Sequence, residues 1–164
     1  MGLELIPAYG HQEEIVTLFT EYTDMLMEQD AVVRQYLILQ NYQKELAHPE
    51  SKYGMPEGRL YLACWDGQLA GCIGLRKLDE ARGELKRLYV RPDFRGHRIG
   101  EALIRRILDD AREIGYRHVL LDTLPFLHAA VRLYREMGFY EIGCYNESPI
   151  ETTIFMQYDL YGDI

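Results

Sequence analysis

One stretch, residues 85–103 (LKRLYVRPDFRGHRIGEAL), constrains the fold of this chain more than any other. Apolar residues ending at Val90 predict a strand, and apolar residues at helical spacing from Ile99 onward predict an amphipathic helix. A basic turn that contains glycine joins the two elements. Such a unit presents free backbone N–H groups and the positive end of a helix dipole. Because arginines surround the turn, the stretch predicts a site for an anion such as phosphate.

Hydrophobic periodicity divides the rest of the chain into strands and helices. The predicted strands are 3–8, 59–65, 68–78, 84–90, 117–123, 139–144 and 153–160, and the predicted helices are 12–27, 32–47, 99–114 and a helix from Pro125 to Met137. Asp66-Gly67 predicts a hairpin turn, and 51–58 reads as a polar loop. The pattern predicts an α/β fold in a single domain, with a mixed, mostly antiparallel twisted sheet of about seven strands and helices on both faces.

Length and composition exclude several classes of protein. A chain of 164 residues favours one domain, and no window approaches the roughly 18 uninterrupted apolar residues of a membrane span. The N-terminus lacks the features of a signal peptide. The three cysteines form no C-x-x-C pair, which argues against a disulfide framework or a zinc site and favours a reducing cytoplasm. The net charge of −8 argues against nucleic-acid binding.

Charge is distributed unevenly along the chain. Residues 1–58 contain ten acidic and three basic residues, whereas residues 85–98 contain five basic residues and one acidic residue. The acidic part is either a solvated helix surface or an approach for a cationic substrate, since such fields steer charged ligands. The basic part coincides with the predicted anion site.

Two segments contain motifs: Arg95-Gly96-His97-Arg98-Ile99-Gly100 and Leu133-Tyr134-Arg135-Glu136-Met137-Gly138-Phe139. The first resembles the acyl-CoA loop of the GCN5-related N-acetyltransferase (GNAT) family, and the second resembles that family's second signature. The resemblance covers residues 59–160. It implies an acyl-CoA N-acyltransferase fold over 1–164, with 59–160 as the acetyl-CoA-binding core and 1–58 on the acceptor side.

The resemblance also implies which residues bind the co-substrate. They are Leu88, Tyr89, Val90, Arg95, Gly96, His97, Arg98, Ile99 and Gly100. The strand would pair with pantetheine through its backbone, with the amide of Val90 or a neighbour polarising the acetyl carbonyl. Arg98 departs from the family pattern, which usually has a glycine there. If that position needs a positive φ, arginine there costs about 1 kcal/mol of strain.

Two residues are expected to be catalytic. Glu84 lies six residues before Val90 and is predicted to share its strand face, where the resemblance implies a base that takes the amine proton. Glu84 could equally be a solvated residue at a strand start, and Glu151 and Asp122 are weaker candidates. Tyr134 matches the family's acid, which protonates the leaving sulfur, although it could also be a half-buried packing residue.

The resemblance and the predicted site together favour an acetyl-CoA-dependent N-acetyltransferase that acts by direct transfer in a ternary complex, without a metal. Its acceptor would be a small cationic amine or a peptide amine, and the family resemblance adds a homodimer as one arrangement. The alternative is a CoA-binding sensor domain without turnover. Tyr145 and Asn146 are candidates for the acceptor pocket, Leu127 replaces a family asparagine, and Trp65 is expected in core or hairpin packing.

Overall fold

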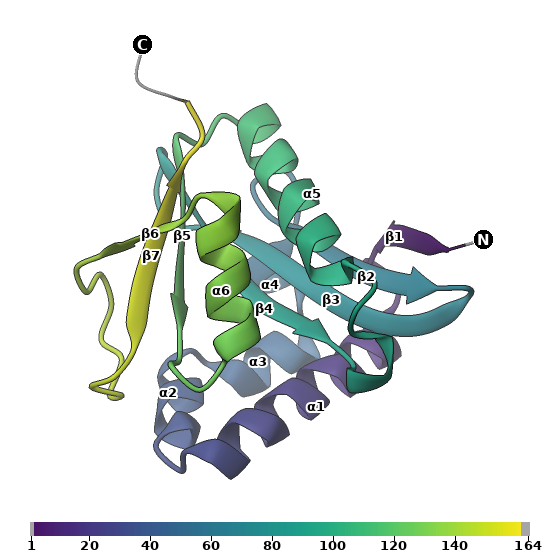
Figure 1. Ribbon diagram of the computed structural model, residues 1–164, viewed down its shortest axis with the longest axis horizontal. Coiled ribbons are helices and arrows are strands. Elements are labelled where there is room, and N and C mark those ends of the chain that lie inside the picture. The colour runs from purple at the N-terminus through teal and green to yellow at the C-terminus, as the bar shows by residue number, and fades with distance from the viewer. Residues whose placement is uncertain (1, 162–164) are drawn as a thin grey trace.

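The computed structural model describes residues 2–161, so Met1 and residues 162–164 of the predicted domain lie outside the described part. The strands form one seven-stranded sheet in the order β1-β2-β3-β4-β5-β7-β6 (Figure 1). They are β1 (Leu3–Pro7), β2 (Arg59–Trp65), β3 (Gln68–Lys77), β4 (Arg82–Val90), β5 (His118–Thr123), β6 (Tyr140–Ile142) and β7 (Ile154–Asp159). The helices are α1 (Gln12–Gln29), α2 (Val33–Leu39), α3 (Tyr42–Ala47), α4 (Glu50–Tyr53), α5 (Ile99–Ile114) and α6 (His128–Met137), with a short 3₁₀ turn at Pro92–Phe94.

Helices cover both faces of the sheet, which confirms the predicted fold class. One core packs α5 and Tyr134 of α6 against the sheet, and a second core packs α1 to α4 against the opposite face. Every neighbouring pair of strands is antiparallel except β4 and β5. None of the helices within residues 2–161 is long and apolar enough to cross a membrane.

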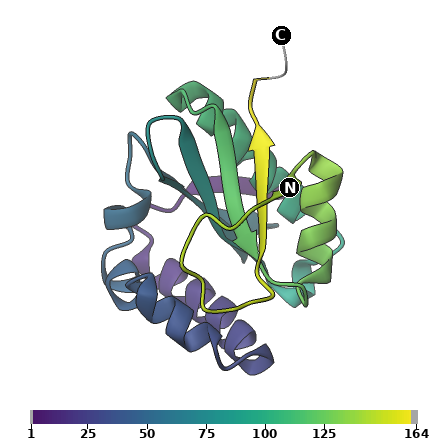
Figure 2. The ribbon, with the colours of Figure 1, turned by 90° about the vertical axis from the view of Figure 1, so that its left-hand side faces the viewer.

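The two parallel strands at the centre of the sheet diverge. Residues 82–84 of β4 pair with residues 118–120 of β5, but β4 continues to Val90 and β5 to Thr123. Within residues 2–161, the divergence leaves the end of β4 between the two helical layers without a neighbouring strand on its β5 side. Figure 2 shows that the connection between β6 and β7 loops toward the helices at the base of the molecule. These segments surround the point where the strands separate.

A β-bulge in β4 changes which face its side chains occupy. Cys72 pairs with Tyr89 and Gly74 pairs with Lys86, so two residues of β4 oppose one residue of β3, and Arg87 adopts a φ of 60°. As a result, Glu84 faces the α1–α4 side, whereas Val90 packs into the α5 side. The prediction that Glu84 shares a strand face with Val90 is therefore wrong, because the inserted residue reverses the alternation.

Three other predictions need correction. The predicted helix 32–47 is two helices, because Asn41 adopts the left-handed conformation that asparagine tolerates better than most residues. The predicted loop 51–58 begins within α4, whose Tyr53 is fully buried and donates a hydrogen bond to Glu45. The helix predicted from Pro125 begins at His128. The other predicted elements lie within two residues of their observed bounds.

Candidate active site

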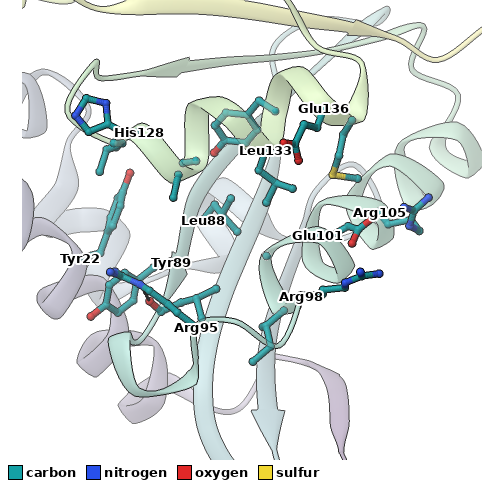
Figure 3. A pocket seen from close by; sticks show the side chains of 18 of the residues that line it. Tyr22, Leu88, Tyr89, Arg95, Arg98, Glu101, Arg105, His128, Leu133 and Glu136 are labelled. Carbon is teal, nitrogen blue, oxygen red and sulfur yellow. Dashed lines mark hydrogen bonds and ion pairs between the residues drawn. The ribbon is translucent and has the colours of Figure 1, made fainter.

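A cavity of about 1330 Å³ opens where β4 ends between α5 and α6. Its walls come from the end of β4, the loop 91–98, the helix starts of α5 and α6, and Tyr22, Met25 and Gln29 of α1 (Figure 3). The predicted co-substrate residues line it, apart from His97. The residues that α1 contributes escaped prediction, because their helical spacing in the sequence signals only an amphipathic helix.

The loop between β4 and α5 has the predicted geometry of an anion site. Arg98 directly precedes α5 with φ 58° and ψ 27°, and Gly96 has a φ of 90°. The backbone therefore turns twice through the left-handed region before the helix starts, which leaves the first amides of α5 free of helical partners. The structure confirms that the Arg98 position requires the positive φ at which glycine is usual.

The arginines around the loop have different tasks. Arg95 and Arg98 are exposed and line the cavity. Arg91 instead donates two hydrogen bonds to the carboxylate of Glu21 in α1, at 2.8 and 3.0 Å, and a third to the carbonyl of Leu69. Arg91 thus connects the loop to α1 and β3, which leaves Arg95 and Arg98 as the arginines of this loop that line the cavity.

Replacing Arg98 with glycine separates the effect of its backbone conformation on stability from the effect of its guanidinium on ligand binding. Relief of backbone strain stabilises the folded state, whereas the greater entropy of glycine stabilises the unfolded chain by a similar amount. Because the two effects oppose each other, we expect the free energy of unfolding to change by less than about 0.5 kcal/mol. Loss of the guanidinium should weaken CoA binding about fivefold, as measured by calorimetric titration. Arg132→Ala, which removes an exposed arginine outside the cavity, is the matched control. Unchanged affinity in Arg98→Gly would show that Arg98 does not contact the ligand.

Tyr134 projects from α6 into the cavity wall. Its side chain is 5% exposed, its ring packs 5.6 Å from that of Phe139, and its hydroxyl has no hydrogen bond within residues 2–161. Burial raises the pKa of Tyr134 well above the ordinary value, so the phenol keeps its proton at neutral pH. Within the described residues, no side-chain oxygen that is closed off from solvent lacks a partner, so the hydroxyl of Tyr134 must open onto the cavity. There it is available to donate a hydrogen bond to a ligand.

Glu84 lies outside this cavity, in a cluster of charges. It is 2% exposed, and its carboxylate accepts hydrogen bonds from Arg76 at 2.6 Å and from the hydroxyl of Tyr145 at 2.5 Å. Burial raises the pKa of Glu84, but the charges of Lys86 and Arg76 and these hydrogen bonds outweigh it and lower the pKa overall. A carboxylate held this way binds a proton weakly.

Asp122 lies near the end of β5, two residues beyond the last pair that β5 makes with β4. Its carboxylate accepts a hydrogen bond from Asn146 at 2.7 Å, and Asn146 also donates to the hydroxyl of Tyr36 in α2 at 3.0 Å. Burial raises the pKa of Asp122 to about 6, despite the hydrogen bond from Asn146. Its charge acts on the titration of Tyr22, Tyr134 and Tyr145, so these side chains converge on the point where β4 and β5 separate.

The remaining residues that were singled out in the sequence lie in the loop before α5, at the start of α6 and in the connection between β6 and β7. His97 stacks on Trp65 with ring centroids 4.3 Å apart, so Trp65 supports the loop as well as packing against the core. Leu127 lines the cavity at the start of α6. Glu151 is exposed in the connection between β6 and β7.

Comparison with known proteins identifies the family. The model of the acetyltransferase (GNAT) family matches residues 18–139. A relative from Schizosaccharomyces pombe, named as an uncharacterized N-acetyltransferase, is 37% identical over 126 residues, which cover 76% of this chain and 77% of that protein. The chain therefore belongs to the GNAT family of acetyltransferases.

Solved structures agree with this fold. An acetyltransferase from Streptococcus agalactiae superposes with a TM-score of 0.77 at 21% identity and covers 97% of this chain and 99% of its own. The PaiA N-acetyltransferase from Thermoplasma acidophilum, solved in complex with coenzyme A, superposes with a TM-score of 0.72 at 17% identity over 97% and 99% of the two chains.

Proposed function

We propose that this protein transfers the acetyl group of acetyl-CoA to a primary amine by direct attack in a ternary complex. The observation that carries the proposal is the cavity at the diverging ends of β4 and β5, which joins the anion site of the loop to the hydroxyl of Tyr134, a group that makes no hydrogen bond to another described residue. The division into an acetyl-CoA-binding core at 59–160 and an acceptor side at 1–58, and a cytoplasmic location, belong to the same proposal.

The residues present fit acetyl-CoA as a substrate. The left-handed turn at Arg98 and the free amides of α5 suit a pyrophosphate, with Arg95 and Arg98 beside it. Leu88 and Val90 end a strand that has lost its neighbour, so their backbone groups can pair with the amides of pantetheine. The coenzyme A bound to the Thermoplasma protein, which shares this fold, supports the same choice of ligand.

The proposed chemistry conserves its protons. The neutral amine nitrogen attacks the thioester carbonyl, a C–N bond forms, and the C–S bond breaks. An alkylamine with a pKa of about 10.4 is almost wholly protonated at pH 7, so a base must remove a proton at a cost of about 4.6 kcal/mol. After the attack the nitrogen loses a second proton, and the departing thiolate gains one from the hydroxyl of Tyr134. The second proton from nitrogen restores the hydroxyl of Tyr134, and the proton taken by the base is released to solvent.

Two carboxylates compete for the role of base. Glu84 was expected from the sequence, but its ion pair with Arg76 and its lowered pKa make it a weak proton acceptor. Asp122 has a pKa raised to about 6 and lies on the far side of the strand divergence from Lys86. A base works best when its pKa lies near the working pH. We therefore propose Asp122 as the base, with Glu84 positioning Tyr145 and Arg76.

A screen of amines tests the proposed activity. The protein is mixed with acetyl-CoA and each of a panel of amines, and the release of free thiol is followed. We expect release that depends on the amine and an N-acetylated product identified by mass. Tight CoA binding with no release from any amine would contradict the transferase and support a CoA-binding sensor domain instead.

A further inference from the structure

Lys86 is a buried ammonium group that the proposed chemistry does not use. It lies on β4 beside the bulge, and its side chain is 6% exposed. Its Nζ lies 3.9 Å from Oε1 of Glu84 and 6.0 Å from the ring centroid of Tyr36, and it makes no hydrogen bond within the described residues. Within the described residues, no side-chain nitrogen or oxygen that is closed off from solvent lacks a hydrogen-bond partner, so Nζ must reach an opening in the protein. An ammonium that reaches an opening and has no protein acceptor can take an acceptor from a ligand.

The charges around Lys86 are unbalanced. Arg87 and Lys52 share the single carboxylate of Glu45, with contacts of 2.8 Å from each cation, and Arg76 already neutralises Glu84. Arg87, Lys52 and Arg76 together exceed the two carboxylates by one positive charge. The ammonium of Lys86 raises the net charge of this buried cluster from +1 to +2. Burial lowers the pKa of Lys86 to about 7, and although Glu84 opposes this change, Arg87 and Lys52 reinforce it. An anion at this position would remove the imbalance.

Lys86 also occupies the right place for contact with an acceptor. Glu84 pairs with Leu120 as the last register position shared by β4 and β5, so Lys86 and Asp122 each lie two residues beyond it on their own strands. Both side chains face the α1–α4 side of the sheet. Asn146 donates hydrogen bonds to the carboxylate of Asp122 and to the hydroxyl of Tyr36. The ring of Tyr36 in turn lies beside the ammonium of Lys86, so these two residues connect Asp122 with Lys86. An ammonium and the proposed base thus flank the same gap between the strands.

We propose that Lys86 binds a carboxylate of the acceptor, so that the acceptor is an amino carboxylic acid and not a purely cationic amine. The amine of the acceptor would face Asp122, while the carboxylate of the acceptor would accept a hydrogen bond from the ammonium of Lys86. Glu21 and Glu45, which bond to side chains of β4, do not argue against this substrate, because Glu21 is paired with Arg91 and Glu45 with Arg87 and Lys52. This inference rests on the proposed transferase activity and narrows its substrate class.

Matched acceptors test the inference. A panel of amino carboxylic acids is compared with the corresponding carboxamides, which retain the amine and lose the negative charge. For the natural chain we expect kcat/KM to be about 30-fold higher for the acids, since a hydrogen bond to a charged group contributes this much. Equal use of acids and carboxamides would overturn the inference while leaving the transferase intact, whereas thiol release with no amine at all would contradict the proposed function itself.

Variants of Lys86 assign the preference to this residue. In Lys86→Met the ratio of kcat/KM for acids over carboxamides should fall to near one, and Lys86→Arg should restore part of it. Lys52→Met removes a neighbouring cation and is the control, for which we expect the ratio to persist. Circular dichroism and the unfolding midpoint establish that each variant is folded. A loss of kcat/KM in Lys86→Met that is equal for acids and carboxamides would show a structural role and overturn the proposal.

Discussion

Replacing Asp122 with asparagine is expected to lower kcat/KM about 10³-fold at pH 8. Asparagine cannot take a proton from the amine, and loss of a general base commonly costs 10²- to 10⁴-fold. The pH profile gives a second signature. Because the base must be ionised to act and its pKa is about 6, kcat/KM of the natural chain for an acceptor without a carboxylate, which does not need the charge of Lys86, should be full above pH 7 and fall tenfold per pH unit below pH 6. In Asp122→Asn this acidic limb should disappear.

Glu84→Gln is the matched control for this prediction. Like Asp122→Asn, it replaces a carboxylate by an amide of the same shape, here on the neighbouring strand β4. It also removes the negative charge that pairs with Arg76. We expect Glu84→Gln to keep the acidic limb and to lose no more than about tenfold in kcat/KM. The opposite pattern, in which Glu84→Gln removes the limb and Asp122→Asn retains it, would restore Glu84 as the base.

Replacing Tyr134 with phenylalanine is expected to lower kcat about 10²-fold. The ring keeps its packing against Phe139, and the lost hydroxyl has no hydrogen bond within the described residues, so the unfolding midpoint should not fall. What is lost is a donor to the sulfur as its negative charge develops, and a hydrogen bond to a charged group contributes about 1.5–3 kcal/mol. Steady-state kinetics with saturating acetyl-CoA measure this change.

A control variant and a measurement of CoA affinity show whether the loss of kcat in Tyr134→Phe reflects proton donation. Tyr161→Phe removes a hydroxyl that is 51% exposed and lies outside the cavity, and it should leave kcat unchanged. CoA affinity should change little in Tyr134→Phe, because the hydroxyl acts on the departing sulfur and not on bound CoA. A variant that binds CoA tenfold more weakly but turns over at the normal kcat would place Tyr134 in binding and contradict its role as the acid.

The sequence predicted what local patterns determine. The hairpin at Asp66-Gly67 and the helix 99–114 follow from turn residues and periodicity, and the structure has both. The positive φ at Arg98 was raised as a condition by the family resemblance, and the structure has it. Two motifs about 40 residues apart were enough to place most of the co-substrate residues on the cavity. Helix boundaries near Asn41 and His128 were missed because they depend on single-residue conformations.

Long-range features of the site were missed for another reason. The bulge at Arg87 is stabilised by Glu45, which lies 42 residues away in α3, and no local pattern in β4 signals the extra residue. Without that bulge, simple alternation places Glu84 on the face of Val90. Tyr22, Lys86 and Asp122 come from three elements that meet only in the folded sheet, so their raised or lowered pKa values could not be foreseen from spacing.

Mass analysis of a single turnover tests direct transfer most directly. Protein in excess over acetyl-CoA is quenched at intervals, with and without an amine that the screen has identified, and free thiol, acetylated amine and intact protein are quantified. Direct transfer predicts thiol and acetylated amine in equal amounts, no thiol release without the amine, and a protein that gains no acetyl group. An acetylated protein that forms without amine and loses its acetyl group when amine is added would contradict this account.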